Sequence, residues 1–227
     1  MLAFYITLAV AIVAMLVFVI AWKPNTPLLD FFLKGIATIS VISLCAVSLN
    51  YYTFDTTAIL LIIGLAFCML GDVALSLREF NFENQESKII LSGELAFSFA
   101  QIVFIVMLAI LSSFISLWGL LFGVVFAIIM LLSRKLLKLD FKESLLPSLL
   151  YAFLLASNVG GSLIWLITGG ASLMQILLFS GFLMFIISDL ILSKIYFGGV
   201  KAPWVQKVNY LAYYIAIILI AMCTITF

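Results

Sequence analysis

The sequence has 227 residues, of which 67% are hydrophobic and only 9% are charged, and its net charge is +1. A soluble domain needs far more polar residues to cover its surface, so this composition predicts an integral membrane protein, with residues 1–227 forming one domain. The near-neutral charge and the lack of a basic tail argue against a nucleic-acid partner. The sequence contains no histidine, which argues against a zinc-dependent membrane hydrolase.

Charged residues, proline and glycine divide the chain into segments that are long enough to cross a membrane. A span requires roughly 20 apolar residues, and in lipid only a helix satisfies the backbone of such a segment internally. We therefore expect an all-α, polytopic fold with about eight transmembrane helices. Their predicted spans are 3–22, 28–49, 56–77, 89–111, 114–133, 144–168, 171–194 and 204–226.

The first predicted span lacks the features of a cleaved secretory signal. Such a signal carries positive charge before a shorter apolar core, and a small-residue cleavage site follows it. Here the first charged residue is Lys23, after the apolar run. We expect this segment to be retained as a helix.

Basic residues fall in alternate connections between the predicted helices. Ten of the 11 basic residues lie in or close to the connections after the first, third, fifth and seventh spans: Lys23, Arg78, Lys88, Arg134, Lys135, Lys138, Lys142, Lys194, Lys201 and Lys207. The two termini and the other three connections hold none. Because cytoplasmic loops are enriched in lysine and arginine, the pattern predicts basic loops in the cytoplasm and both termini outside, in the cell membrane if the protein is bacterial.

Two aspartates lie inside predicted spans, in similar local sequences. Asp72 in "CMLGDVALSL" and Asp189 in "FIISDLILSK" are each about five residues before the cytoplasmic end of a span. A charge at the bilayer centre costs roughly 2.5 to 3.5 kcal/mol, and such groups usually face the bundle interior or a water-filled cavity. Aspartate is too short to extend to the interface, so we expect both aspartates to face the interior of the bundle. The longer side chains of Lys34 and Glu94 could instead extend to the membrane interface, and both placements remain open for them.

Further polar residues lie in the cytoplasmic halves of four other predicted helices. The candidates for binding a substrate are Lys34, Glu94, Gln101, Tyr151, Asn158, Asn209, Tyr210, Tyr213 and Tyr214. Several follow helical spacing, so that they share a face. Together with the two aspartates they predict a polar cavity open to the cytoplasm or the inner leaflet. Because desolvation disfavours charge, two buried carboxyls near a lysine can hold different protonation states, as acid/base catalysis requires.

Two pairs of short segments suggest an internal repeat. Residues 71–76 align with 188–193, and "LAFSFA" at 95–100 resembles "LAYYIA" at 211–216. This pattern predicts a possible 4+4 parallel repeat about an axis along the membrane normal. Gly119 and Gly123 form a GxxxG motif, which we interpret as close helix packing rather than a dimer face.

The ordered motifs "FLKGIAT", Gly71-Asp72, "AFSFAQIVF", "FIISDLIL" and "NYLAYY" resemble those of the YhhN-like lysoplasmalogenase family, over nearly the whole chain. The resemblance implies eight helices and cleavage of the vinyl ether bond of lysoplasmalogens, which gives a fatty aldehyde and a glycerophospho-base. It implies that Asp72 and Asp189 are the catalytic pair and that Lys34 is a helper or phosphate partner. No metal and no cofactor are expected. The chain departs from the family at Gly35, where proline is common, at Gln101, where histidine is common, and at Tyr214, where glutamine is common.

Two other functions fit the same polar residues. A transporter would use the buried aspartates as proton or ion sites, but its polar groups should continue into the outer leaflet, and these do not. A non-catalytic lipid-binding or sensor protein would keep the pocket without turnover, which agrees with the missing histidine. In the enzyme hypothesis the partner is a lysophospholipid in the inner leaflet.

Overall fold

The computed structural model describes residues 2–24, 26–48, 56–80, 85–113 and 117–226. Within these ranges the chain is helical and contains no strand, which confirms the predicted all-α fold with about eight helices. The helices are α1 (Leu2–Ala21), α2 (Pro27–Ser48), α3 (Thr56–Ser76), α4 (Glu86–Ser112), α5 (Leu117–Ser133), α6 (Leu145–Thr168), α7 (Leu173–Tyr196) and α8 (Pro203–Met222). Short 3₁₀ turns follow at η1 (Leu77–Phe80), η2 (Lys142–Ser144) and η3 (Cys223–Thr226).

Seven of these helices are long and apolar enough to cross a membrane. The remaining helix, α5, has 17 residues, which is the lower limit for a span. The protein is therefore an integral, multi-pass membrane protein. The predicted boundaries differ from the observed ones by a few residues, and the largest differences are at α4 and α8. The predicted end of the second span at 49 and the predicted start of the fifth at 114 lie outside the described residues.

Local sequence explains where several helices begin. Pro27 and Pro203 occupy the first positions of α2 and α8, where the missing N–H is not needed. Ser172 caps α7 in a capping box, in which the Ser172 and Gln175 side chains each accept a hydrogen bond from the other residue's backbone N–H.

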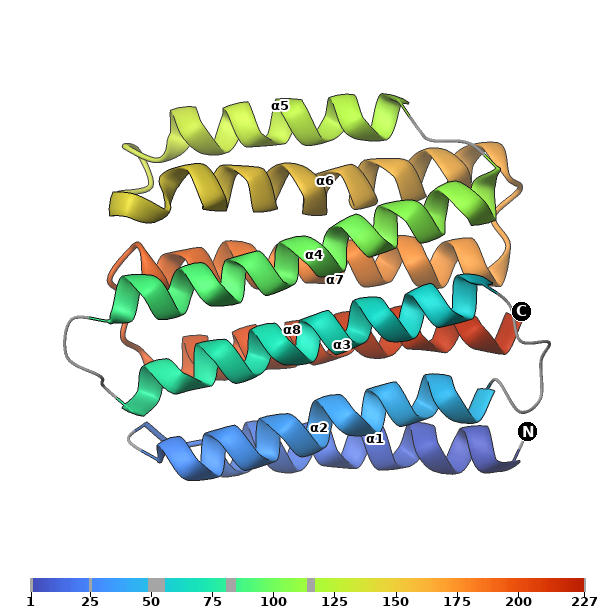
Figure 1. Ribbon diagram of the computed structural model, residues 1–227, viewed down its shortest axis with the longest axis horizontal. Coiled ribbons are helices and arrows are strands. Elements are labelled where there is room, and N and C mark those ends of the chain that lie inside the picture. The colour runs from blue at the N-terminus through green and yellow to red at the C-terminus, as the bar shows by residue number, and fades with distance from the viewer. Residues whose placement is uncertain (1, 25, 49–55, 81–84, 114–116, 227) are drawn as a thin grey trace.

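Helices adjacent in sequence pack as antiparallel pairs, α1 with α2, α3 with α4, α5 with α6 and α7 with α8 (Figure 1). Between pairs, α2 contacts α3 and α8, and α6 contacts α7 and α4. The contacts of the first four helices match those of the last four: the α2–α3 contact corresponds to α6–α7, and the α2–α8 contact corresponds to α6–α4. This is the packing that a 4+4 parallel repeat requires. One departure is that α1 also packs against α8.

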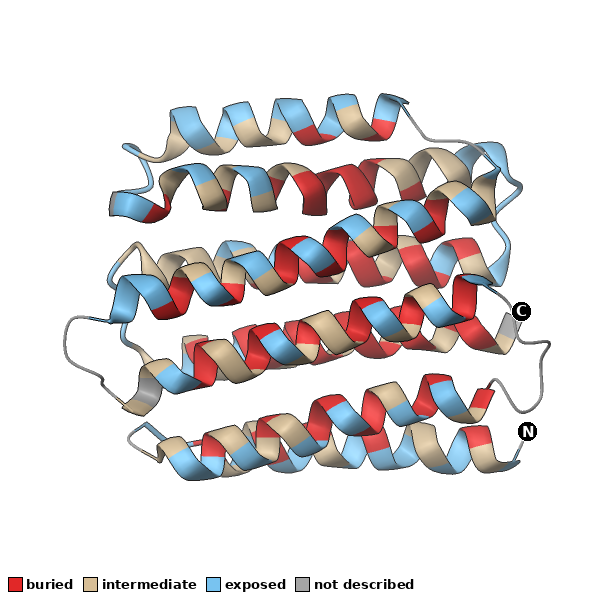
Figure 2. Ribbon diagram, in the orientation of Figure 1, coloured by how far each residue is buried: buried red, intermediate tan, exposed pale blue. Residues whose placement is uncertain are grey.

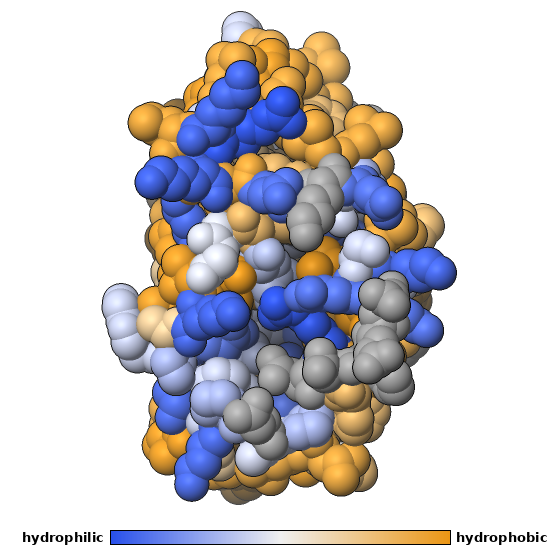
Figure 3. All heavy atoms as spheres, turned by 90° about the vertical axis from the view of Figure 1, so that its left-hand side faces the viewer, coloured by the Kyte–Doolittle hydropathy of each residue, from blue (hydrophilic) through white to orange (hydrophobic). Residues whose placement is uncertain are grey.

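Both termini lie at one end of the bundle, and the four connections that carry basic residues lie at the other (Figure 1). Figure 3 shows this second end, where hydrophilic side chains gather and hydrophobic side chains surround them. We call it the basic end. The basic connections therefore lie at the opposite end from the termini, as the sequence predicted for an even number of spans. The assignment of the basic end to the cytoplasm stays a prediction from the charge distribution.

Helix α5 is the most exposed of the eight helices, and Gly119 and Gly123 are its buried residues (Figure 2). A Cβ atom on Gly119 would lie 2.7 Å from the Gly161 nitrogen of α6, and one on Gly123 would lie 2.5 Å from the Phe153 carbonyl oxygen. The GxxxG motif therefore brings α5 against α6 within the chain, as we interpreted it.

We predict that Gly123→Ala lowers the free energy of unfolding by about 1 to 3 kcal/mol, because the added methyl group forces α5 away from α6. Denaturant titration of the purified protein in detergent measures this change. The matched control is Gly35→Ala in α2, whose added methyl group meets no described heavy atom within 4 Å. The control should be as stable as the wild type or more stable, since alanine favours a helix over glycine. Equal stability of Gly123→Ala and the wild type would contradict the packing described.

Candidate functional site

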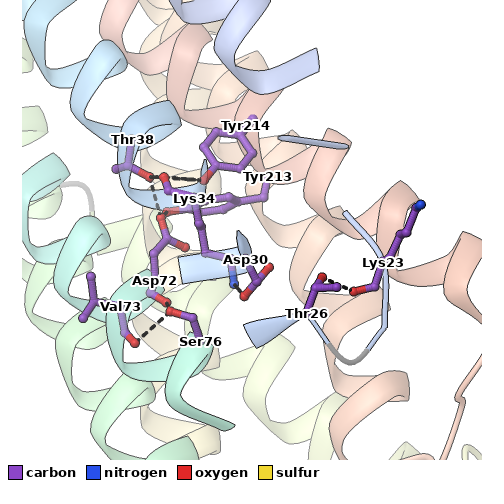
Figure 4. A network of polar contacts seen from close by, with 10 residues as sticks. All are labelled: Lys23, Thr26, Asp30, Lys34, Thr38, Asp72, Val73, Ser76, Tyr213 and Tyr214. Carbon is purple, nitrogen blue, oxygen red and sulfur yellow. Dashed lines mark hydrogen bonds and ion pairs between the residues drawn. The ribbon is translucent and has the colours of Figure 1, made fainter. Parts of the chain in front are cut away.

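Asp72 lies in a buried polar network formed by α2, α3 and α8 (Figure 4). Its Oδ2 atom accepts hydrogen bonds from the Thr38 hydroxyl at 2.9 Å and from the Tyr213 hydroxyl at 2.8 Å. The Tyr214 hydroxyl lies 3.3 Å from the Thr38 hydroxyl and donates to the Lys34 carbonyl oxygen at 3.1 Å. Hydrogen bonds to a charged acceptor are stronger than neutral ones, so three helices hold this carboxyl in one position.

The Lys34 side chain forms an ion pair with Asp30, one helical turn earlier in α2. Lys34 Nζ lies 3.3 Å from Asp30 Oδ2 and 4.9 Å from the centre of the Tyr210 ring, within cation–π range. Both charged side chains are buried, at 7% exposure for Lys34 and 1% for Asp30. No described residue donates a hydrogen bond to either Asp30 oxygen, so the contact is electrostatic. Lys34 thus lies beside the Asp72 network, and its ammonium pairs with Asp30.

Asp189 belongs to a second network, formed by α4, α6 and α7. The Tyr151 hydroxyl donates a hydrogen bond to Asp189 Oδ2, and the Ser148 hydroxyl donates one to Glu94 Oε1. All four residues line a cavity of about 530 Å³, a size typical of small-molecule sites.

The rest of the cavity wall is mainly apolar. Phe126, Ile129 and Met130 of α5 form one side, and Leu75 and Leu155 lie on other helices. The lining extends to Leu137, Leu139 and Lys194 at the basic end, where Lys194 Nζ donates to the Leu137 carbonyl oxygen at 2.7 Å. Among the described residues, the cavity lining therefore combines an apolar wall with the carboxyl groups of Asp189 and Glu94 and the cation of Lys194.

Phe97 of α4 lies between the two networks. Its ring centre is 6.0 Å from that of Tyr213, which bonds Asp72, and 6.3 Å from that of Tyr151, which bonds Asp189. A Cβ atom on Gly71 would come within 2.6 Å of this ring, so the glycine before Asp72 leaves room for it. The carboxyl groups in the described cavity lining are Asp189 and Glu94, while Asp72 is 6% exposed in its own network.

The remaining predicted site residues contact other protein groups. The Asn158 side-chain amide donates to Gln101 Oε1 at 2.9 Å and links α6 to α4, with both residues fully buried. The Asn209 amide donates to the Ser188 carbonyl oxygen at 2.7 Å and links α8 to α7 beside Asp189. These residues hold together the helices that carry the carboxyls.

Sequence reasoning missed two residues of these networks, Asp30 and Ser148. The signal for Asp30 was its spacing of four from Lys34 within one predicted span, which is the spacing of helical ion pairs. Ser148 precedes Tyr151 by three residues and so shares its face. In the described part of the chain, no three histidine, cysteine, aspartate or glutamate side chains are grouped as a metal site.

The profile of the YhhN family matches residues 29–224, from the start of α2 to η3. No curated protein sequence matches significantly, and neither does any solved structure.

The Lys34–Asp30 pair provides a direct test of this arrangement. We predict that Lys34→Met lowers the free energy of unfolding by about 3 to 5 kcal/mol, because it leaves the Asp30 carboxyl buried without its ion partner. The double variant Asp30→Asn/Lys34→Met should recover most of this loss, since no unpaired charge then remains. Denaturant titration of both variants in detergent measures the difference. A double variant no more stable than Lys34→Met would contradict the pairing.

Proposed function

The chain belongs to the YhhN family, and on that premise we propose that it is a membrane-embedded hydrolase that cleaves the vinyl ether bond of lysoplasmalogens. The products are a fatty aldehyde and a glycerophospho-base. The observation that supports the proposal most is the cavity between α4, α5, α6 and α7, which has carboxyl groups in an apolar wall.

The cavity suits a lipid with one chain and a phosphate. Its apolar wall matches a hydrocarbon chain, and Lys194 at the basic end offers a cation to the phosphate group. In a lysoplasmalogen the vinyl ether bond lies just below the headgroup, which corresponds to carboxyls a short way in from the basic end. With the basic end in the cytoplasm, the substrate enters from the inner leaflet.

The proposed reaction starts with protonation of the vinyl ether β carbon by a carboxylic acid, which leaves an oxocarbenium ion. Water then adds to the α carbon and gives up a proton to a carboxylate. The resulting hemiacetal breaks its bond to the glycerol oxygen, so that the aldehyde and the alcohol separate. Two carboxyl groups in different protonation states carry out these proton transfers.

Asp189 and Asp72 have different parts in this proposal. Asp189 lines the cavity, and its bond from Tyr151 orients it toward the substrate. Asp72 lies beyond Phe97, where two hydroxyl donors fix it. From there its negative charge stabilises the oxocarbenium ion through a low-dielectric interior. Of the candidate binding residues, Tyr213 and Tyr214 form hydrogen bonds in the Asp72 network, and Tyr210 contacts the Lys34 ammonium beside it.

A non-catalytic lipid-binding protein is the second candidate. The observation that favours it is Gln101, which stands where the family commonly has histidine and is fully buried against Asn158. An amide cannot transfer protons as an imidazole does. Such a protein would bind the same lipid without turnover.

We predict that Asp189→Asn and Asp72→Asn each reduce aldehyde release from a lysoplasmalogen by about 100-fold or more, the usual contribution of a positioned acid or base for Asp189 and of electrostatic stabilisation for Asp72. Purified protein in detergent is assayed with the lysoplasmalogen and with its saturated ether analogue, which cannot release aldehyde. Both variants should still bind the analogue, as measured by its effect on thermal unfolding. Unchanged turnover in either variant would contradict the role proposed for that aspartate, and binding without turnover in the wild type would favour the second candidate.

For the phosphate contact, we predict that Lys194→Met raises KM for the lysophospholipid by about tenfold and leaves kcat nearly unchanged, because a charge-assisted hydrogen bond at the cavity mouth is lost. The matched control is Lys207→Met at the same end of the bundle, where Lys207 Nζ donates to the Ile20 carbonyl oxygen at 3.1 Å. Steady-state kinetics of the two variants provide the comparison. Equal KM values for both would show that Lys194 does not hold the phosphate.

A further inference from the structure

Glu94 is a second carboxyl group in the cavity that contains Asp189. It projects from α4, one helical turn before Phe97, and lines the cavity together with Tyr151 and Ser148. Its Oε1 accepts a hydrogen bond from the Ser148 hydroxyl. Its Oε2 is buried, and no described residue donates a hydrogen bond to it. A carboxylate with one oxygen buried and unpaired is costly, whereas a carboxylic acid that carries its proton on that oxygen needs no donor there.

The hydrogen bonds of the three carboxyl groups differ in a way that separates their tasks. Asp72 Oδ2 accepts from two hydroxyl groups, and Asp72 is not part of the described lining. Asp189 accepts from Tyr151 within the cavity. Glu94 alone of the three has a buried oxygen without a protein donor among the described residues. It therefore has the geometry of a group that donates a proton, and Asp189 has that of a group that accepts one.

We propose that Glu94 is the proton donor of the reaction and acts directly on the vinyl ether, with Asp189 as its partner in the same cavity. This inference rests on the proposed function. The proton of the Glu94 carboxyl group moves to the β carbon and forms a C–H bond there as the C=C π bond breaks, and Glu94 is left as a carboxylate. Asp189 then takes a proton from the water that attacks the α carbon. The hemiacetal collapses as its hydroxyl proton moves to the Glu94 carboxylate and the glycerol oxygen leaves with the proton that Asp189 had taken from water. Both carboxyl groups return to their starting states, and one water is consumed per bond cleaved.

The chain offers a matched pair of substitutions on one helix. Glu94→Gln keeps the shape of the side chain and an oxygen that accepts from Ser148, but it removes the transferable proton. Glu86→Gln makes the same change at the start of α4, where the Glu86 side chain is 61% exposed and pairs with Arg78. Both variants are measured for aldehyde release from a lysoplasmalogen and for binding of the saturated ether analogue.

Glu94→Gln should reduce kcat by about 100-fold or more while its Kd for the analogue stays within about threefold of the wild type. Glu86→Gln should match the wild type in both measurements. If Glu94→Gln loses analogue binding, Glu94→Asp decides: a carboxyl on a shorter side chain should restore binding and part of kcat, and a loss as deep as that of Gln would overturn the inference.

The outcomes also separate this inference from the proposed function. Aldehyde release by the wild type together with full kcat in Glu94→Gln would overturn the inference and leave the proposed hydrolase standing. No aldehyde release by the wild type would overturn the proposed function and this inference with it.

Discussion

Water is absent from the hydrocarbon interior of a bilayer, so a polar group placed there is costly unless it finds a partner within the protein. This constraint explains the arrangement of the buried residues near the basic end. Lys34 pairs with Asp30, Asp72 receives two hydroxyl donors, and Asn158 pairs with Gln101. Each contact but the first joins different helices, so that satisfying the polar groups also fixes the neighbours of α2, α3, α4, α6 and α8.

The two aspartates have equivalent places in the repeated packing of the helices. Asp72 on α3 faces α2 and α8, and Asp189 on α7 lies with α6 and α4. The same shift in residue number that relates Asp72 to Asp189 relates Lys34 to Tyr151. The surroundings of the two aspartates nevertheless differ: the Lys34–Asp30 ion pair lies beside the Asp72 network, and the cavity lies beside Asp189. We propose that the cavity beside Asp189 holds the lipid and that Asp72 supplies a fixed negative charge next to it.

The sequence was sufficient to predict the helices, because hydropathy and the alternation of basic connections depend on local composition and on the bilayer thickness. It also indicated that polar residues would gather at the basic end. It did not show that Asp72 and Asp189 lie in separate networks, because helical spacing gives the depth and face of a residue but not the neighbouring helix. Phe97, which lies between the networks, looks in the sequence like any apolar residue of a span. Asp30 was overlooked because it stands near the end of its helix, where a charge is inexpensive.

The central claim is that the cavity between α4, α5, α6 and α7 holds a single-chain ether lipid. An experimental structure with the saturated ether analogue bound tests it most directly. The account predicts that the alkyl chain lies against Phe126 and Met130, with the ether linkage beside Asp189 and Glu94 and the phosphate at Lys194. An analogue bound instead beside Lys34 and Tyr210, with the cavity occupied by protein side chains, would contradict it.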